Sequence, residues 1–155
     1  MKRDEVKEQI LKWLSQEQDW KVEVSTDPYY YFTCLVRLSE SMGCNICIEN
    51  HIERVNVIGN AMLSQSDRIN YRLSAEKDEF WIDLRMNLIY VGINVAAIPD
   101  IESLESIQLT KPIYFDGLSQ DKLIDVILRV TDALELAELI FRNFSDAMSQ
   151  QLRKG

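Results

Sequence analysis

The stretch WKVEVSTDPYYYFTCLVRLSESMGCNICI, residues 20–48, decides the fold class, because apolar and polar residues alternate along most of it. Alternation over residues 20–25 is typical of a half-buried strand. Asp27 and Pro28 then indicate a turn. A second strand follows, and one of its faces carries Tyr30, Phe32, Cys34, Val36 and Leu38.

The sequence beyond this stretch continues the same pattern. Residues 39–43 form a short polar loop of hairpin length, and residues 44–48 predict a third strand. A fourth strand follows around residues 55–57. Four short strands with short connections predict an antiparallel meander with one face in solvent.

Helical periodicity flanks the meander. Residues 4–17 carry one apolar stripe and predict an N-terminal helix. After the meander, Ser64 is a helix N-cap with Asp67 three residues later. Apolar residues keep a helical spacing from Ile69 to Leu88. Ser74 could start a new helix, so residues 64–89 are either one kinked helix or two.

The C-terminal part adds two strands and a long helix. Residues 89–98 and 107–115 predict strands, the second at an edge or bulged because Pro112 lacks an N–H. Ser119 is a strong N-cap, and the apolar stripe after it predicts a helix of about six turns, roughly 35–40 Å long. We therefore expect an α+β fold: an antiparallel β-sheet with an N-terminal helix, a middle helix and a long C-terminal helix packed on one face.

Composition limits the class of protein. A chain of 155 residues with 46% apolar residues, 5 Gly and 3 Pro predicts a single domain over residues 1–155 with a real core. The net charge of −8 repels phosphate backbones and anionic lipid, so no nucleic acid and no membrane are expected as partners. No apolar run could span a bilayer, and the first residues lack a signal-peptide core, which predicts a cytoplasmic location.

Three cysteines and one histidine form the one set of residues that resembles a metal site. Cys34, Cys44, Cys47 and His51 would be enough ligands for tetrahedral zinc. However, positions 44 and 47 have opposite parity on the predicted strand and should point to opposite faces. We therefore expect no metal and no cofactor. A small metal-dependent or redox-sensing protein that uses these four residues is the alternative function.

No catalytic motif is present. The chain has a single histidine and lacks a G-x-S-x-G elbow, a Walker pattern and a Rossmann glycine pattern. We expect no catalytic residues and a non-enzymatic interaction module that binds a protein partner or itself.

Two groups of apolar residues are candidates for an interface. Tyr29 and Tyr31 belong to an aromatic run on a predicted strand, and tyrosine is enriched at interfaces. The C-terminal helix is longer than a strand, so its far end could meet a second copy in a homodimer; the residues there are Phe141, Phe144 and Met148. The N-terminal helix could instead cover this stripe within one chain.

The order helix, β-meander, helix, two strands and long helix resembles the type III secretion chaperone-like fold, which is also seen in small YbjN-like bacterial proteins. The segment KPIYFDGLS, residues 111–119, is similar to the end of a family of uncharacterised archaeal proteins with that fold. The resemblance implies a dimeric, chaperone-like binding module. It implies no catalytic residues.

Overall fold

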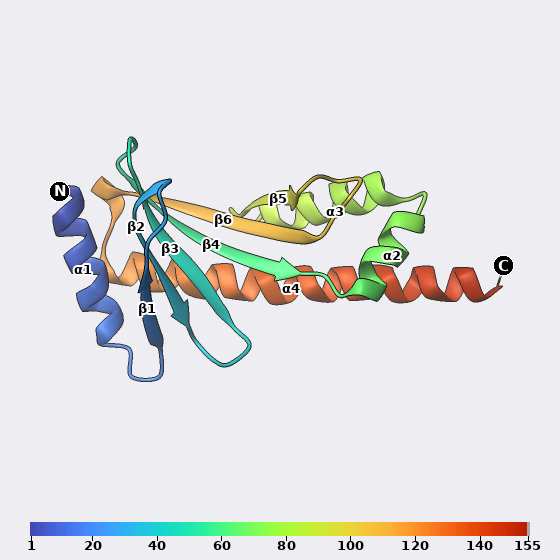
Figure 1. Ribbon diagram of the computed structural model, residues 1–155, viewed down its shortest axis with the longest axis horizontal. Helices are drawn as coiled ribbons and strands as arrows, with labels where there is room; N and C mark the ends of the chain where they lie inside the picture. Colours follow the sequence, from blue (N-terminus) through green and yellow to red (C-terminus); the bar gives the residue numbers. More distant parts are fainter. Residues whose placement is uncertain (155) are drawn as a thin grey trace. The chain divides into compact units, whose positions relative to one another are not determined.

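The computed structural model describes residues 1–154 and contains six strands and four α-helices (Figure 1). The elements are, in chain order, α1 (Arg3–Ser15), β1 (Lys21–Ser25), β2 (Tyr30–Arg37), β3 (Gly43–Glu49), β4 (Arg54–Met62), α2 (Gln65–Leu73), α3 (Lys77–Ile89), β5 (Asn94–Ile98), β6 (Ser106–Tyr114), a short 3₁₀ turn (Phe115–Gly117) and α4 (Gln120–Lys154).

The strands form one open antiparallel sheet in the order β1-β2-β3-β4-β6-β5. Strands β1 to β4 pair with their sequence neighbours in antiparallel register, which confirms the predicted meander. The α+β fold with a long C-terminal helix is confirmed as well.

The chain divides into two compact units. The first contains residues 1–59 and 110–131, and the second contains residues 60–109 and 132–154. The chain passes between the units within β4, β6 and α4. The single domain that the length indicates stays a prediction, because two units that share three continuous elements can belong to one domain.

The first unit buries the predicted N-terminal stripe and the inner faces of the meander. Val6, Ile10 and Leu14 of α1 are buried, which matches the helical spacing. On the surface, Arg3 Nε donates a 2.8 Å hydrogen bond to the carbonyl oxygen of Glu49. These contacts hold α1 beside the meander within this unit.

The second unit resolves the region after the meander into two helices. Ser64 caps α2, since its Oγ accepts the N–H of Asp67 at 3.2 Å. Ser74 ends α2 with an extended backbone, and its Oγ accepts the N–H of Glu76 at 3.0 Å, just before α3. The polar side chain of Ser74 therefore ends one helix and precedes the next, and residues 64–89 form two helices.

Two predictions about the later strands are wrong. Residues 89–93 are not a strand, because α3 runs to Ile89 and Gly92 turns the chain with a φ of 74°. A backbone with positive φ suits glycine and cannot continue a strand. The strand that contains Pro112 is not at an edge, since β6 lies between β4 and β5. Strand β5 has five residues beside the nine of β6, so it is too short to flank β6 over its whole length.

The long helix α4 begins as the sequence predicts. Ser119 Oγ accepts the N–H of Lys122 at 3.1 Å, which satisfies one of the unpaired amides of the first turn. The helix has 35 residues. None of the described helices combines the length and apolar character that a bilayer span requires.

Candidate interaction surface

Strand β5 is one edge of the sheet and carries no protection against pairing. The strand order ends at β5, so one of its edges has no neighbouring strand within residues 1–154. Natural edge strands are usually blunted by charged residues or proline. The sequence of β5 is NVAAI, without charge or proline, whereas the opposite edge strand β1 carries Lys21 and Glu23. The composition of β5 leaves its backbone free to pair.

Helix α3 carries apolar residues on two faces. Phe80, Trp81, Leu84 and Leu88 are buried in the second unit. A second set lies on the solvent side: Ile82, Met86 and Ile89 are 56%, 51% and 58% exposed. Their spacing of four and three residues forms one stripe along the helix. A stripe of this kind has no partner inside its own helix.

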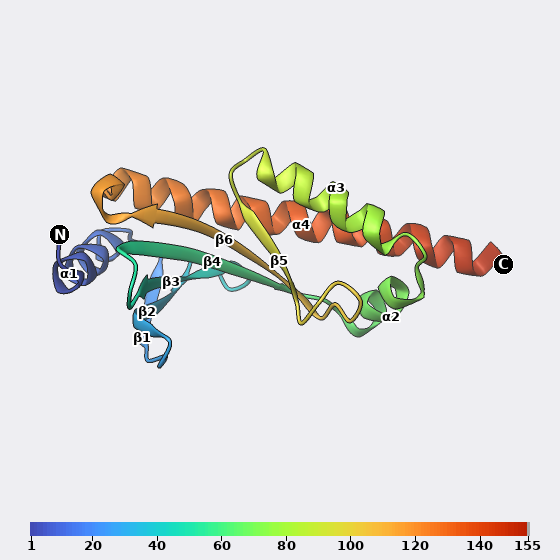
Figure 2. The ribbon, with the colours of Figure 1, turned by 90° about the horizontal axis from the view of Figure 1, so that it is seen from above.

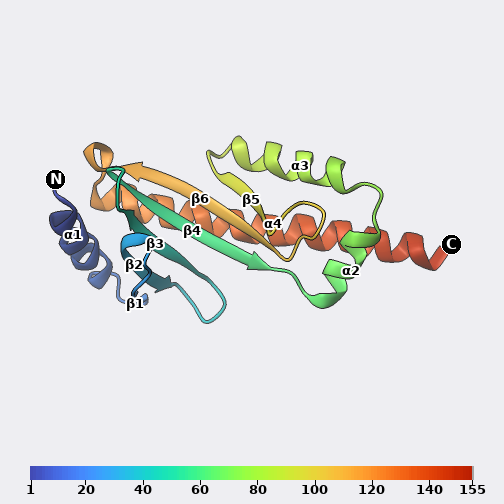
Figure 3. The same cartoon turned by 45° about the horizontal axis from the view of Figure 1, so that its top comes forward.

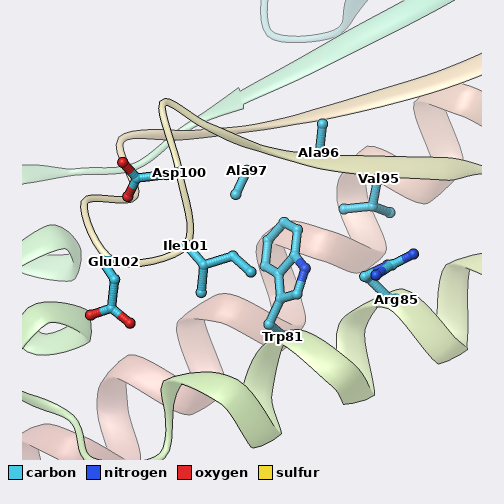
Figure 4. Close-up of a pocket in the computed structure, with 8 residues that line it drawn as sticks. All are labelled: Trp81, Arg85, Val95, Ala96, Ala97, Asp100, Ile101 and Glu102. Carbon is cyan, nitrogen blue, oxygen red and sulfur yellow. The ribbon is translucent and has the colours of Figure 1, made fainter.

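A pocket of about 620 Å³ opens between α3 and β5. Figures 2 and 3 show β5 between α3 and the first part of β6, so its free edge lies on the side of α3. The lining residues come from α3, from β5 and from the loop after β5: Trp81, Arg85, Val95, Ala96, Ala97, Asp100, Ile101 and Glu102 (Figure 4). The pocket, the β5 edge and the stripe Ile82–Met86–Ile89 are together called the α3–β5 surface.

Charges stand at the two ends of the pocket. Arg85 lies beside Val95 at one end, and Asp100 and Glu102 lie at the other (Figure 4). Glu102 forms a 3.4 Å ion pair with Lys77, and an oxygen of Asp100 accepts the N–H of Ser103 at 2.7 Å. Because Lys77 offsets one of the two carboxylates, that end keeps net negative charge opposite a positive end.

The acidic end of the pocket is fixed to the core of the second unit. The hydroxyl of Tyr71 donates a 2.5 Å hydrogen bond to the carbonyl oxygen of Ile101. Burial, and then the nearby carboxylates of Glu102, Asp78 and Asp100, raise the pKa of Tyr71 to about 12. The hydroxyl therefore remains a donor at neutral pH. The Tyr71 ring packs 6.0 Å from Phe80 and 5.8 Å from Phe141, centroid to centroid.

The candidate interface residues of α4 lie largely inside this core. Phe141 is 1% exposed and Met148 is 8% exposed, while Phe144 is half-buried. The rings of Phe141 and Phe144 pack against those of Tyr71 and Phe80. The elements α2 and α3 thus cover this part of the stripe within the unit. A role of Phe141, Phe144 and Met148 in an interface stays a prediction.

The two tyrosines of the first unit are on the surface. Tyr29 is 83% exposed and Tyr31 is 40% exposed. The hydroxyl of Tyr31 donates to a carboxylate oxygen of Asp4, which ties β2 to α1. An interface at these residues stays a prediction.

The cysteines of the proposed metal set are buried and separated by the sheet. In the β2–β3 register, Cys34 is opposite Ile46 and Cys47 is opposite Thr33, so Cys34 and Cys47 belong to residue pairs of opposite parity. Burial raises the pKa of Cys34 and Cys44 to about 12, and that of Cys47 to about 11. His51 is exposed in the turn after β3. No group of three or more metal-ligating side chains occurs in the described part of the chain.

Sequence reasoning missed the α3–β5 surface, although two of its signals are present. The stripe Ile82–Met86–Ile89 has helical spacing, and NVAAI lacks charge. Both signals were hidden, because apolar residues on two faces of α3 read as one buried helix and residues 89–93 read as strand.

A family model described as "Uncharacterized conserved protein (DUF2299)" matches residues 6–141. Among solved structures, the chain is similar to an uncharacterized protein from Methanothermobacter thermautotrophicus, with a TM-score of 0.78 and 24% sequence identity. The similarity covers 88% of this chain and 96% of that chain and shows a shared fold. No curated protein matches the chain. The expected similarity to uncharacterised archaeal proteins is confirmed in this coarse form, and the secretion chaperone-like and YbjN-like resemblance stays a prediction.

Proposed function

The chain belongs to this family of uncharacterized conserved proteins, and we propose that it is a non-enzymatic interaction module that binds a protein through its α3–β5 surface. The observation that carries this proposal is the position of an unprotected sheet edge beside an open pocket and an exposed apolar stripe. The chaperone-like role that the resemblance implies is one form of the same proposal.

The edge of β5 supports recognition of an extended segment. An extended chain that pairs with a free edge gains backbone hydrogen bonds, and pockets beside the edge select alternate side chains. Pocket volumes of roughly 300–1,000 Å³ are typical of binding sites, and the pocket next to β5 has about 620 Å³. Backbone pairing and side-chain selection are thus available at one place.

The distribution of charge also favours binding over catalysis. An active site needs an acid, a base or a nucleophile that converge on one reacting atom. In the pocket, Arg85 stands at one end and Asp100 and Glu102 at the other, with Trp81 and Ile101 between them (Figure 4). Charges separated along an apolar floor suit an extended ligand.

Site-specific photo-cross-linking tests this proposal without naming the partner in advance. A photoreactive benzoyl-phenylalanine replaces Met86, which is 51% exposed, in cells that express the chain. The matched control places the same residue at Val24, which is 59% exposed on the protected edge β1.

The proposal expects a protein adduct at position 86 that mass spectrometry identifies, and little at position 24. An adduct at neither position, or equal adducts at both, contradicts it.

A further inference from the structure

We propose that the protein bound at the α3–β5 surface is a second copy of this chain, whose β5 pairs antiparallel with β5 across a two-fold axis. The inference rests on the proposed function and commits it to one partner. Three properties of the surface support it: the charge at its ends, the residues of the edge, and the position of the exposed stripe.

The pocket is self-complementary in charge. Its positive end, at Arg85, lies beside the start of β5, and its negative end lies in the loop that follows β5. A two-fold rotation that makes two β5 strands antiparallel brings Arg85 of one copy toward the partner's Asp100. The same rotation brings Asp100 toward the partner's Arg85. Every closed two-fold contact of this kind therefore contains the charge pair twice.

The residues of β5 permit close approach of two backbones. With the axis at Ala96, that residue faces the partner's Ala96, and Val95 faces the partner's Ala97. Paired strands lie about 4.8 Å apart, and small alanine side chains leave this spacing free of obstruction. Because β5 carries no charge, no like charges meet across the axis.

The apolar stripe of α3 lies next to the pocket wall. Successive helical residues are about 100° apart, so Ile82 lies about 60° from Arg85 around the helix and Ile89 about 40° from it on the same side. A chain that contacts Arg85 therefore also covers Ile82 and Ile89, which are 56% and 58% exposed. Burial of this apolar area adds a driving force to the backbone pairing.

Charge-swap mixing tests the arrangement. Light scattering of the wild-type chain is expected to give a mass that rises with concentration to twice 18.1 kDa. Arg85→Glu and Asp100→Arg should each weaken the dimer about tenfold or more, because each places two like-charged pairs in the interface. An equimolar mixture of the two variants should dimerise again, since both charge pairs are opposite in the mixed dimer.

A second pair of variants guards against a folding defect, because Asp100 also accepts the N–H of Ser103. Ala96→Lys and Ala96→Glu change an exposed side chain and place like charges opposite each other across the axis. Each should be a folded monomer by circular dichroism and light scattering, and their mixture should dimerise.

A wild-type mass of 18.1 kDa at all micromolar concentrations overturns the inference, as does a dimer that neither variant pair weakens and restores. An adduct to another protein at position 86, together with a monomeric wild type, removes the self-pairing and leaves the proposed function standing.

Discussion

The hydroxyl of Tyr71 donates a 2.5 Å hydrogen bond to the carbonyl oxygen of Ile101. This bond joins a buried residue of α2 to the loop that forms the acidic end of the α3–β5 pocket. The aromatic packing of Tyr71 on Phe80 and Phe141 fixes the donor. The shape of the pocket therefore depends on the core of the second unit.

Tyr71→Phe keeps the ring and removes the donor. Loss of one neutral hydrogen bond at a buried position should lower the free energy of unfolding by about 1 kcal/mol, as measured by urea denaturation. Tyr90→Phe is the control, because Tyr90 is 85% exposed and should change stability little. Equal stability of wild type and Tyr71→Phe would show that the bond contributes nothing.

Stability should fall in alkali, and Tyr71 should contribute to the fall. The pKa of Tyr71 is about 12 in the folded chain against an ordinary value of 10.0. Its contribution is fully present below pH 10, and it is lost as pH rises toward 12, because the unfolded chain then releases a proton that the folded chain retains. Urea denaturation at several pH values should give a shallower decline for Tyr71→Phe than for wild type. Identical slopes would contradict the raised pKa.

The three cysteines should be inert in the folded chain. Cys34, Cys44 and Cys47 are 0%, 2% and 3% exposed, and burial raises their pKa values to between about 11 and about 12. Since the thiolate is the reactive form, a chromogenic disulfide reagent at neutral pH should label the thiols only after unfolding in urea. Rapid labelling of the folded chain would return the redox-sensing alternative to consideration.

Phe141→Ala separates a core role from an interface role. A buried phenylalanine that contacts Tyr71 and Phe80 should cost about 3–5 kcal/mol of stability when truncated. Leu139→Ala, at a position that is 51% exposed on the same helix, should cost much less. If thermal unfolding of Phe141→Ala matches wild type while the dimer is lost, Phe141 is an interface residue instead.

The regular elements were predictable because each has a strong local cause. The alternation over residues 20–48 specified β1 to β3, and the side chains of Ser64 and Ser119 cap α2 and α4 where the sequence indicates. The boundary at residues 89–93 was not predictable from periodicity, because the turn depends on the positive φ of Gly92. The α3–β5 surface was missed for a related reason. Its free edge is a property of the strand order, which depends on contacts between distant residues.

Hydrogen exchange at the two sheet edges tests the central claim most directly. Strand β1 (Lys21–Ser25) is the control for β5 (Asn94–Ile98), because both are edge strands of five residues. If a second copy covers the α3–β5 surface, protection of the β5 amides should increase as the concentration of the wild-type chain is raised, and protection of the β1 amides should not. Protection at β5 that is the same at low and high concentration would contradict the account.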